Sequence, residues 1–190
     1  DDVPYDVKVG VPIHAGDACR DDVLLAVSDL NVTFGGAKGV HAVRGVNWQL
    51  HRGETLGIVG ESGSGKSVTS LAVMGLLPSN ARVTGSVTYR GRELLASNDK
   101  KMSAVRGRGI AMIFQDPMTS LDPVYKVGAQ ISETLKAHSP ELTRAQRRDR
   151  SIELLETVGI PNAAKRVDEF PHEFSGGMRQ RVVIAIAMAN

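Results

Sequence analysis

The chain has 190 residues, of which 42% are hydrophobic and 23% charged, and its formal net charge is +2. This length fits one domain with a sizeable core, and the small charge points to neither a nucleic acid nor an anionic membrane as partner. Cys19 is the only cysteine, so the chain forms no internal disulfide and no cysteine metal cluster, and a cytosolic setting fits. The longest apolar run, residues 182–189, is too short to span a bilayer, and the acidic N-terminus is unlike a signal peptide. A membrane role would therefore be peripheral and through a partner.

The first half of the chain reads as an irregular arm followed by strands. Residues 1–22 show no periodic pattern, whereas residues 24–34 are rich in Val, Leu and Thr and predict a strand. A glycine turn at 35–39 leads to residues 46–50, which alternate between apolar and polar side chains as a half-buried strand does. Residues 55–59 have no polar alternation, which predicts a strand buried on both faces of a parallel sheet.

Further elements follow in the order helix, strand, strand, helix. We expect a helix over 66–77 that Pro78 ends, a short strand over 85–91, and a second apolar strand over 110–114. Thr143 and Gln146 have the spacing of a capping box, and Gly159 supplies a left-handed stop after the helix they open. Four arginines lie in this helix, and we interpret them as a solvated face, with a surface that touches a partner as the alternative. They are Arg144, Arg147, Arg148 and Arg150.

The stretch between the predicted strand 55–59 and the helix after it has the phosphate-loop pattern. Its residues are Gly60, Glu61, Ser62, Gly63, Ser64, Gly65, Lys66 and Ser67, followed by Val68. Glycines let successive backbone N–H groups point inward, and the new helix adds its free N–H groups and the positive end of its dipole. Lys66 would then reach the β- and γ-phosphates of a nucleotide, and Ser67 would give its hydroxyl to Mg²⁺. The sequence therefore predicts a nucleoside triphosphate site.

A second glycine motif further along narrows the class of protein. Residues 174–178 read Phe-Ser-Gly-Gly-Met and resemble the signature motif of ATP-binding cassette (ABC) proteins, usually Leu-Ser-Gly-Gly-Gln. Ser175 can cap a helix, and Gly176 and Gly177 let a ligand approach the backbone closely. Although Val182 and its neighbours favour strands, the cap, residues 178–181 and three alanines predict a helix through 189.

The resemblance assigns roles to more residues. The apolar run that ends at Gln115 is similar to the strand before the family's Q-loop, whose glutamine contacts Mg²⁺ or the attacking water. In this family an aromatic residue before the phosphate loop stacks on adenine, and Phe34 fits that place, with a role in the core as the alternative. His41 and Val43 would lie beside the base.

Three stretches resemble the ATPase subunits of oligopeptide, dipeptide and nickel importers: residues 59–67, 114–123 and 170–181. In that branch Phe174 and Met178 at the edges of the signature are usual, and peptide is favoured over nickel as cargo. The resemblance covers residues 23–190 and implies an α/β fold with a phosphate-loop ABC ATPase core, an antiparallel β subdomain and a helical subdomain at about 116–176. It also implies a head-to-tail dimer with a second ABC ATPase subunit, in which Ser175, Gly176 and Gly177 act on the partner's ATP. Two membrane-spanning permease subunits and, indirectly, an extracytoplasmic binding protein complete the assembly at the cytoplasmic face of the membrane.

The family pattern also includes a strand that ends in Asp-Glu and supplies an Mg²⁺ ligand and the general base. We find no such strand in residues 1–190, because only Asp116 follows Gln115 and no apolar strand precedes Asp168 and Glu169. We therefore expect an incomplete ABC domain that binds nucleotide without hydrolysing it, while the full-length protein would be an ATPase coupled to transport. The alternatives are a non-transport ABC-type ATPase, for repair or regulation, and a module that only binds.

Overall fold

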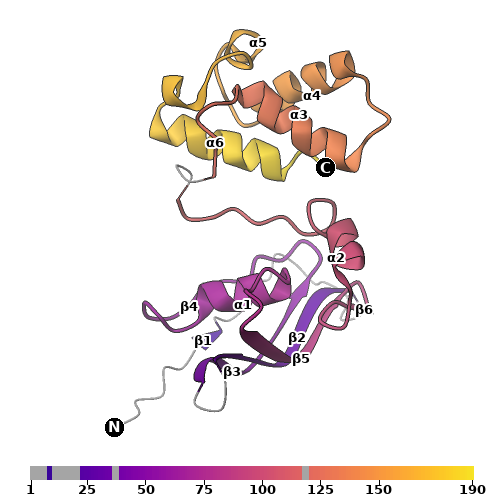
Figure 1. The fold of residues 1–190 in the computed structure, drawn as a ribbon, viewed down its shortest axis with the longest axis vertical. Coiled ribbons are helices and arrows are strands. Elements are labelled where there is room, and N and C mark those ends of the chain that lie inside the picture. Colours follow the sequence, from indigo (N-terminus) through magenta and orange to yellow (C-terminus); the bar gives the residue numbers. More distant parts are fainter. Residues whose placement is uncertain (1–7, 10–21, 36–38, 117–119) are drawn as a thin grey trace. The chain divides into compact units, whose positions relative to one another are not determined.

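The computed structural model describes residues 8–9, 22–35, 39–116 and 120–190 (Figure 1). It divides into two compact units, Asp1–Met102 and Ser103–Asn190, and we describe each unit by itself. Most of the arm predicted at 1–22 lies outside the described residues, as does the centre of the turn predicted at 35–39.

The first unit is built on an antiparallel sheet. Its strands are β2 (Val23–Phe34), β3 (Val40–His51), β5 (Ala81–Tyr89) and β6 (Arg92–Glu93), in the order β3-β2-β5-β6. Apolar side chains alternate along β2 and β3, so one face of the sheet is buried, and Leu30, Val32 and Val87 are fully enclosed. The antiparallel β part expected from the sequence is confirmed.

A bulge at Asp29 interrupts the pairing of β2 with both neighbours. Asp29 has a φ of 46°, and its N–H donates to Asn47 Oδ1 at 2.8 Å. Gly85 on β5 passes so close that a Cβ there would lie 2.3 Å from the Asp29 carbonyl oxygen. The bulge therefore depends on a glycine of the neighbouring strand β5, which is distant in sequence and which no local pattern indicates.

The prediction that residues 55–59 and 110–114 form buried strands is wrong. Of residues 55–59 only β4 (Ile58–Val59) is a strand, it pairs antiparallel with β1 (Lys8–Val9), and Val59 is 58% exposed. Residues 110–114 form a single bridge between Ile110 and Arg106, and Phe114 is 50% exposed. An apolar run is buried on both faces only where strands pair along its edges and helices cover it. Among the described residues, the run 55–59 pairs only through β4 with β1, and the run 110–114 pairs only through the Ile110 bridge.

Helix α1 (Lys66–Val73) begins where predicted but ends before residue 77. Gly75 has a φ of 60°, its N–H donates to the Ala72 carbonyl at 3.0 Å, and Leu76 N–H donates to the Leu71 carbonyl at 2.9 Å. This is a Schellman motif, so a glycine ends the helix before Pro78 does.

The remaining regular elements are helical. They are α2 (Asp99–Val105), α3 (Val127–His138), α4 (Arg144–Thr157), α5 (Ala163–Arg166), α6 (Gly176–Ala187) and the 3₁₀ turn η1 (Pro171–Glu173). In the second unit α3, α4 and α6 share one core, in which Ile131, Leu155 and Val182 are fully buried. No helix of the described residues is long and apolar enough to cross a membrane.

The predicted ends of α4 are confirmed. Gln146 N–H donates to Thr143 Oγ1 at 3.3 Å, and Thr143 N–H donates to Gln146 Oε1 at 2.9 Å, which completes the capping box. Gly159 has a φ of 74°, and the bonds from its N–H to Glu156 and from Ile160 N–H to Leu155 form a second Schellman motif. The run from Val182 is helical, as the cap at Ser175 predicts.

Candidate nucleotide-binding site

The loop between β4 and α1 is a tight turn held by close glycine contacts. Gly63 and Gly65 have φ angles of 83° and 93°, which side-chain-bearing residues rarely adopt. A Cβ on Gly65 would lie 2.4 Å from the Ala42 carbonyl oxygen, and one on Gly60 would lie 2.6 Å from Ser64 Oγ. Gly65 therefore leaves no room for a side chain, because its neighbour is backbone, whereas the neighbour of Gly60 is the end of a side chain.

Lys66 lies over this loop. Its ammonium donates to the carbonyl oxygens of Gly60 and Glu61, both at 2.6 Å, and to Ser64 Oγ at 3.4 Å. Gly65 is the N-cap of α1 and offers no side chain to the first turn, so the N–H groups that open α1 are not capped by a side chain. A lysine ammonium beside an uncapped helix N-terminus concentrates positive charge where an anion would bind.

Hydrogen bonds also connect this turn to helix α1. The hydroxyl and the N–H of Thr69 both donate to the Gly65 carbonyl, at 3.0 and 2.8 Å, and Thr69 is 1% exposed. Ser67, by contrast, is exposed at the start of α1 and Val68 is half-buried. The loop thus has a rigid base and an open side that carries the Ser67 hydroxyl.

The turn end of the β2–β3 hairpin, where Phe34 pairs with Val40, lies near the phosphate loop. Val43 on β3 is the side chain next to Gly65, 3.3 Å from the position of a Cβ there, and it is 1% exposed. His41 Nδ1 lies 3.1 Å from Thr33 Oγ1, and the half-buried Phe34 pairs with Val40 at the end of the hairpin. The structure therefore places the predicted adenine contacts on the strand pair that packs against the loop.

The remaining predicted site residues belong to the second unit. Gln115 is exposed in a bend after Phe114, and Ser175, Gly176 and Gly177 open α6. The structure brings residues 60–68 together with the β2–β3 hairpin in the first unit, whereas Gln115 and the signature residues belong to the second unit.

The signature residues form an exposed helix N-terminus. Ser175 caps α6 by accepting the Met178 N–H at 3.4 Å. Gly176 and Gly177 are exposed, and a Cβ on either would meet no atom within 4 Å. Phe174, just before them, is 2% exposed and anchors the turn in the helical core. The N–H groups at the start of α6 are therefore exposed, and the buried Phe174 holds this end of the helix in place.

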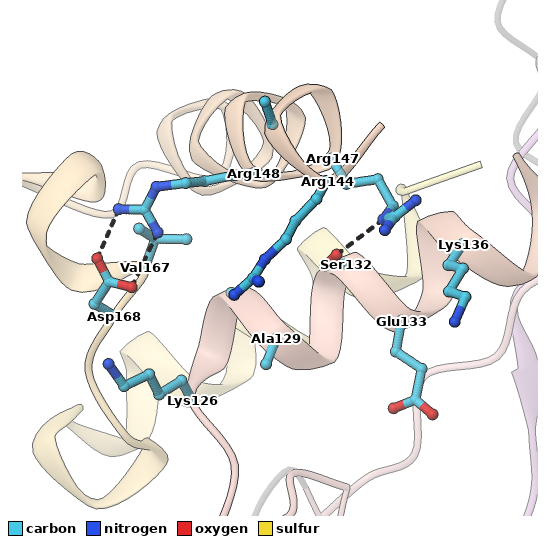
Figure 2. A pocket seen from close by; sticks show the side chains of 12 residues that line it. Lys126, Ala129, Ser132, Glu133, Lys136, Arg144, Arg147, Arg148, Val167 and Asp168 are labelled. Carbon is cyan, nitrogen blue, oxygen red and sulfur yellow. Dashed lines mark hydrogen bonds and ion pairs between the residues drawn. The ribbon is translucent and has the colours of Figure 1, made fainter. Parts of the chain in front are cut away.

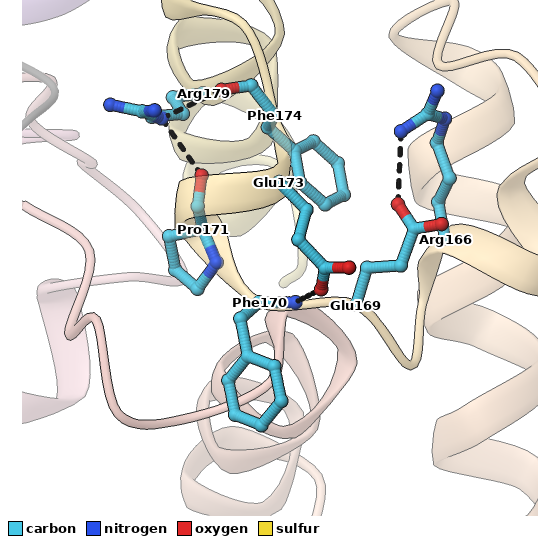
Figure 3. Close-up of polar contacts among 7 residues, drawn as sticks. All are labelled: Arg166, Glu169, Phe170, Pro171, Glu173, Phe174 and Arg179. Carbon is cyan, nitrogen blue, oxygen red and sulfur yellow. Dashed lines mark hydrogen bonds and ion pairs between the residues drawn. The ribbon is translucent and has the colours of Figure 1, made fainter.

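Figure 3 shows polar contacts that hold this turn and that the sequence did not indicate. Arg179 Nε donates to the carbonyls of Pro171 at 2.8 Å and Phe174 at 2.9 Å. The Arg166 guanidinium lies 5.5 Å from the centre of the Phe174 ring. An arginine one turn into α6 thus fixes the chain on the approach to Ser175, and only the fold reveals which carbonyls it reaches.

The arginines of α4 are only partly a solvated face. Arg148 makes two hydrogen bonds to the Asp168 carboxylate, at 2.9 and 2.6 Å, which lower the pKa of Asp168 and raise that of Arg148. Arg147 Nε donates to Ser132 Oγ at 3.2 Å, and Arg150 pairs with Glu153 at 2.9 Å. Two of the arginines therefore connect α4 to other elements of the second unit.

The fold and its phosphate loop are those of a nucleotide-binding domain. Residues 43–190 match the family model described as "ABC transporter", so the chain belongs to the ABC transporter family. It is 55% identical over 169 residues to an oligopeptide transport ATP-binding protein, OppD, of Bacillus subtilis, covering 87% of this chain and 47% of the relative. It is 47% identical over 171 residues to a dipeptide transport ATP-binding protein, DppD, of Lactococcus lactis, covering 89% and 49%. The chain thus spans about half the length of these relatives.

Solved structures agree on the fold. The ATP-binding cassette MJ0796, in a dimeric post-hydrolysis state bound to ADP and phosphate, superposes with a TM-score of 0.72 at 23% identity, covering 88% of this chain and 70% of that one. CbiO1 of Clostridium perfringens, part of an ABC transporter complex, gives a TM-score of 0.65 at 26% identity, covering 89% and 62%. The ABC cassette fold predicted from the sequence is confirmed.

Proposed function

We propose that residues 23–190 are the ATP-binding domain of an ABC importer subunit that couples ATP binding and hydrolysis to peptide uptake. The observation that carries the proposal is the phosphate loop, in which Lys66 lies over a turn where Gly65 has a left-handed φ and no room for a side chain. Similarity to oligopeptide and dipeptide transport proteins supports peptide, rather than nickel, as cargo.

The residues present fit a magnesium-bound nucleotide. The Lys66 ammonium and the first N–H groups of α1 would hold the phosphates, and the exposed Ser67 hydroxyl would be an Mg²⁺ ligand. The described residues contain no group of three His, Cys, Asp or Glu side chains that could hold a metal ion. This suits Mg²⁺, which commonly takes few protein ligands and completes its shell with phosphate oxygens and water. Gln115 would contact the metal or the attacking water, and Phe34 would stack on adenine.

The exposed N-terminus of α6 supports a role toward a second subunit. Ser175, Gly176 and Gly177 have open space around them, which suits the close approach of a phosphate held by another chain. We propose a head-to-tail dimer with a second ABC ATPase subunit, bound to two permease subunits at the cytoplasmic face of the membrane. ABC cassettes form dimers, as the MJ0796 structure illustrates.

Calorimetric titration of this chain with ATP and Mg²⁺ tests the proposal. We expect saturable binding that Lys66→Ala abolishes, because the Lys66 ammonium lies directly on the loop, bonded to the Gly60 and Glu61 carbonyls. Lys165→Ala, an exposed lysine on α5, is the matched control and should bind as the parent chain does. Equal affinity in the two variants would exclude the phosphate-binding role of Lys66.

A further inference from the structure

Helix α3 contacts the chain at one place before Gln115 and at one place after it. The first contact is made by His138, the last residue of α3. A Cβ on Gly107, whose φ is 83°, would lie 2.5 Å from Nε2 and 2.9 Å from Cε1 of the His138 imidazole. The imidazole therefore lies directly on Gly107, at a distance that the absence of a side chain allows.

Gly107 belongs to a small closed loop at the start of the second unit. Its N–H donates to the Ile110 carbonyl at 3.0 Å, and the N–H groups of Gly109 and Ile110 both donate to the Val105 carbonyl, at 2.8 and 3.1 Å. These bonds make residues 105–110 one compact turn. The contact with His138 therefore also fixes Ile110, from which the chain continues to Gln115.

The second contact is made by Gln130, near the start of α3. Its Oε1 accepts the Asp122 N–H at 3.0 Å, and its Nε2 donates to the carbonyls of Asp122 and Tyr125, both at 2.9 Å. Leu121, the preceding residue, is 5% exposed and packs in the helical core. The chain after Gln115 is thus bonded back to the same helix.

Helix α3 is itself fixed within the second unit. Leu135 is 2% exposed in the core, and Gly128 N–H donates to the Val167 carbonyl at 2.9 Å. Figure 2 shows a further link, in which Arg147 Nε of α4 donates to Ser132 Oγ at 3.2 Å. The two side chains that contact the neighbourhood of Gln115 therefore project from a rigid element.

The stretch just before Gln115 has little support of its own. Ile113 is 45% exposed and Phe114 is 50% exposed, and Gln115 is exposed as well. Fifteen residues of extended chain span up to about 50 Å, whereas Gln130 and His138, eight residues apart on a helix, are separated by about 12 Å along its axis. The two contacts thus restrict the positions that Gln115 can reach.

We propose that His138 and Gln130 are positioning residues for Gln115. The inference rests on the proposed function, in which Gln115 contacts Mg²⁺ or the attacking water. A displacement of about 1 Å in a group that orients a reaction can cost up to about a hundredfold in rate. Loss of either contact therefore lowers kcat. It leaves ATP affinity unchanged, because Lys66 and the start of α1, which would hold the phosphates, belong to the first unit.

Hydrogen–deuterium exchange of this chain tests the first contact directly. In His138→Ala the amides of residues 107–110 should exchange roughly tenfold faster, since local opening controls their exchange, while the amides of α1 exchange as in the parent. Gly107→Ala, which places a Cβ in the imidazole, should also speed their exchange. The two changes together should have less than the sum of their separate effects, because the Cβ and the imidazole no longer collide.

Lys136→Ala is the matched control, because it truncates an exposed side chain on the same turn of α3. Its exchange should equal that of the parent chain. Unchanged exchange at residues 107–110 in His138→Ala overturns the inference, and so does equal acceleration in Lys136→Ala.

ATP turnover by the full-length protein tests the consequence for the reaction. We expect His138→Ala and Gln130→Ala each to lower kcat roughly tenfold, with ATP affinity and the turnover of Lys136→Ala as in the parent. Parent values of kcat in both variants overturn the inference, and so does a loss of ATP affinity that matches the loss of kcat, since the fold as a whole is then affected. A parent protein that neither binds nor hydrolyses ATP refutes the proposed function, and the inference with it. Turnover by the parent that both variants retain refutes the inference alone.

Discussion

Two glycines of the phosphate loop allow backbone strain to be separated from close packing. Gly63 and Gly65 both have φ angles in the left-handed region, at 83° and 93°. A Cβ on Gly63 would meet nothing within 4 Å, whereas one on Gly65 would lie 2.4 Å from the Ala42 carbonyl oxygen. Alanine at either position suffers the left-handed strain, but only alanine at Gly65 also collides with β3.

The expected costs follow from these contacts. Left-handed strain destabilises Gly63→Ala by roughly 1–2 kcal/mol. Gly65→Ala has the same strain and also overpacks against backbone, which adds about 1–3 kcal/mol and gives a total of about 2–5 kcal/mol. The reduced freedom of the unfolded chain offsets part of the loss in both variants and cancels when they are compared. The predicted difference between them is therefore about 1–3 kcal/mol.

Urea unfolding of the two variants and the parent chain measures this difference. Gly53→Ala, with a φ of 75° and open space around it, provides a second control outside the loop and should behave like Gly63→Ala. Because Gly65 also sets the start of α1, its variant should lose the most ATP affinity. Equal unfolding free energies for Gly63→Ala and Gly65→Ala would show that β3 does not constrain the loop, and the packing argument would fail.

Three further predictions concern the nucleotide contacts and the second unit. Phe34→Ala should weaken ATP by roughly 1–3 kcal/mol and inorganic triphosphate hardly at all, as calorimetry can show, and equal losses would assign Phe34 to the core. In the full-length protein Gly177→Asp should abolish cooperative ATP turnover and spare ATP binding by the monomer. Since the site has open space, Gly177→Asn controls for size, and lost affinity in the monomer would argue against action across a dimer. The hydrogen bonds from Arg148 lower the pKa of Asp168, so this pair stabilises the fold above the ordinary pKa of Asp and the effect disappears as pH falls through the lowered value. Asp168→Asn should therefore flatten the acid side of the stability–pH curve, and an unchanged curve would mean that the pair has no net effect.

The sequence by itself determined the features that depend on a few neighbouring residues. The capping box at Thr143 and the stop at Gly159 need only residues within about one helical turn, and both are present. The same holds for the cap at Ser175, which outweighs the strand preference of Val182 and its neighbours. The left-handed glycines before Lys66 are equally local, although the close contact of Gly65 with Ala42 on β3 is tertiary. Local chemistry sufficed because each of these groups finds its partner within a few residues.

The tertiary structure decided everything that depends on a distant partner. The apolar runs 55–59 and 110–114 have the sequence pattern of buried strands. Burial, however, depends on neighbouring strands, and both Val59 and Phe114 are exposed. Arg148 finds Asp168 twenty residues away, and Gly128 meets Val167 through the packing of α3 on the segment after α5. The type of a side chain determines which bonds it can make, and the tertiary fold determines which of these bonds form.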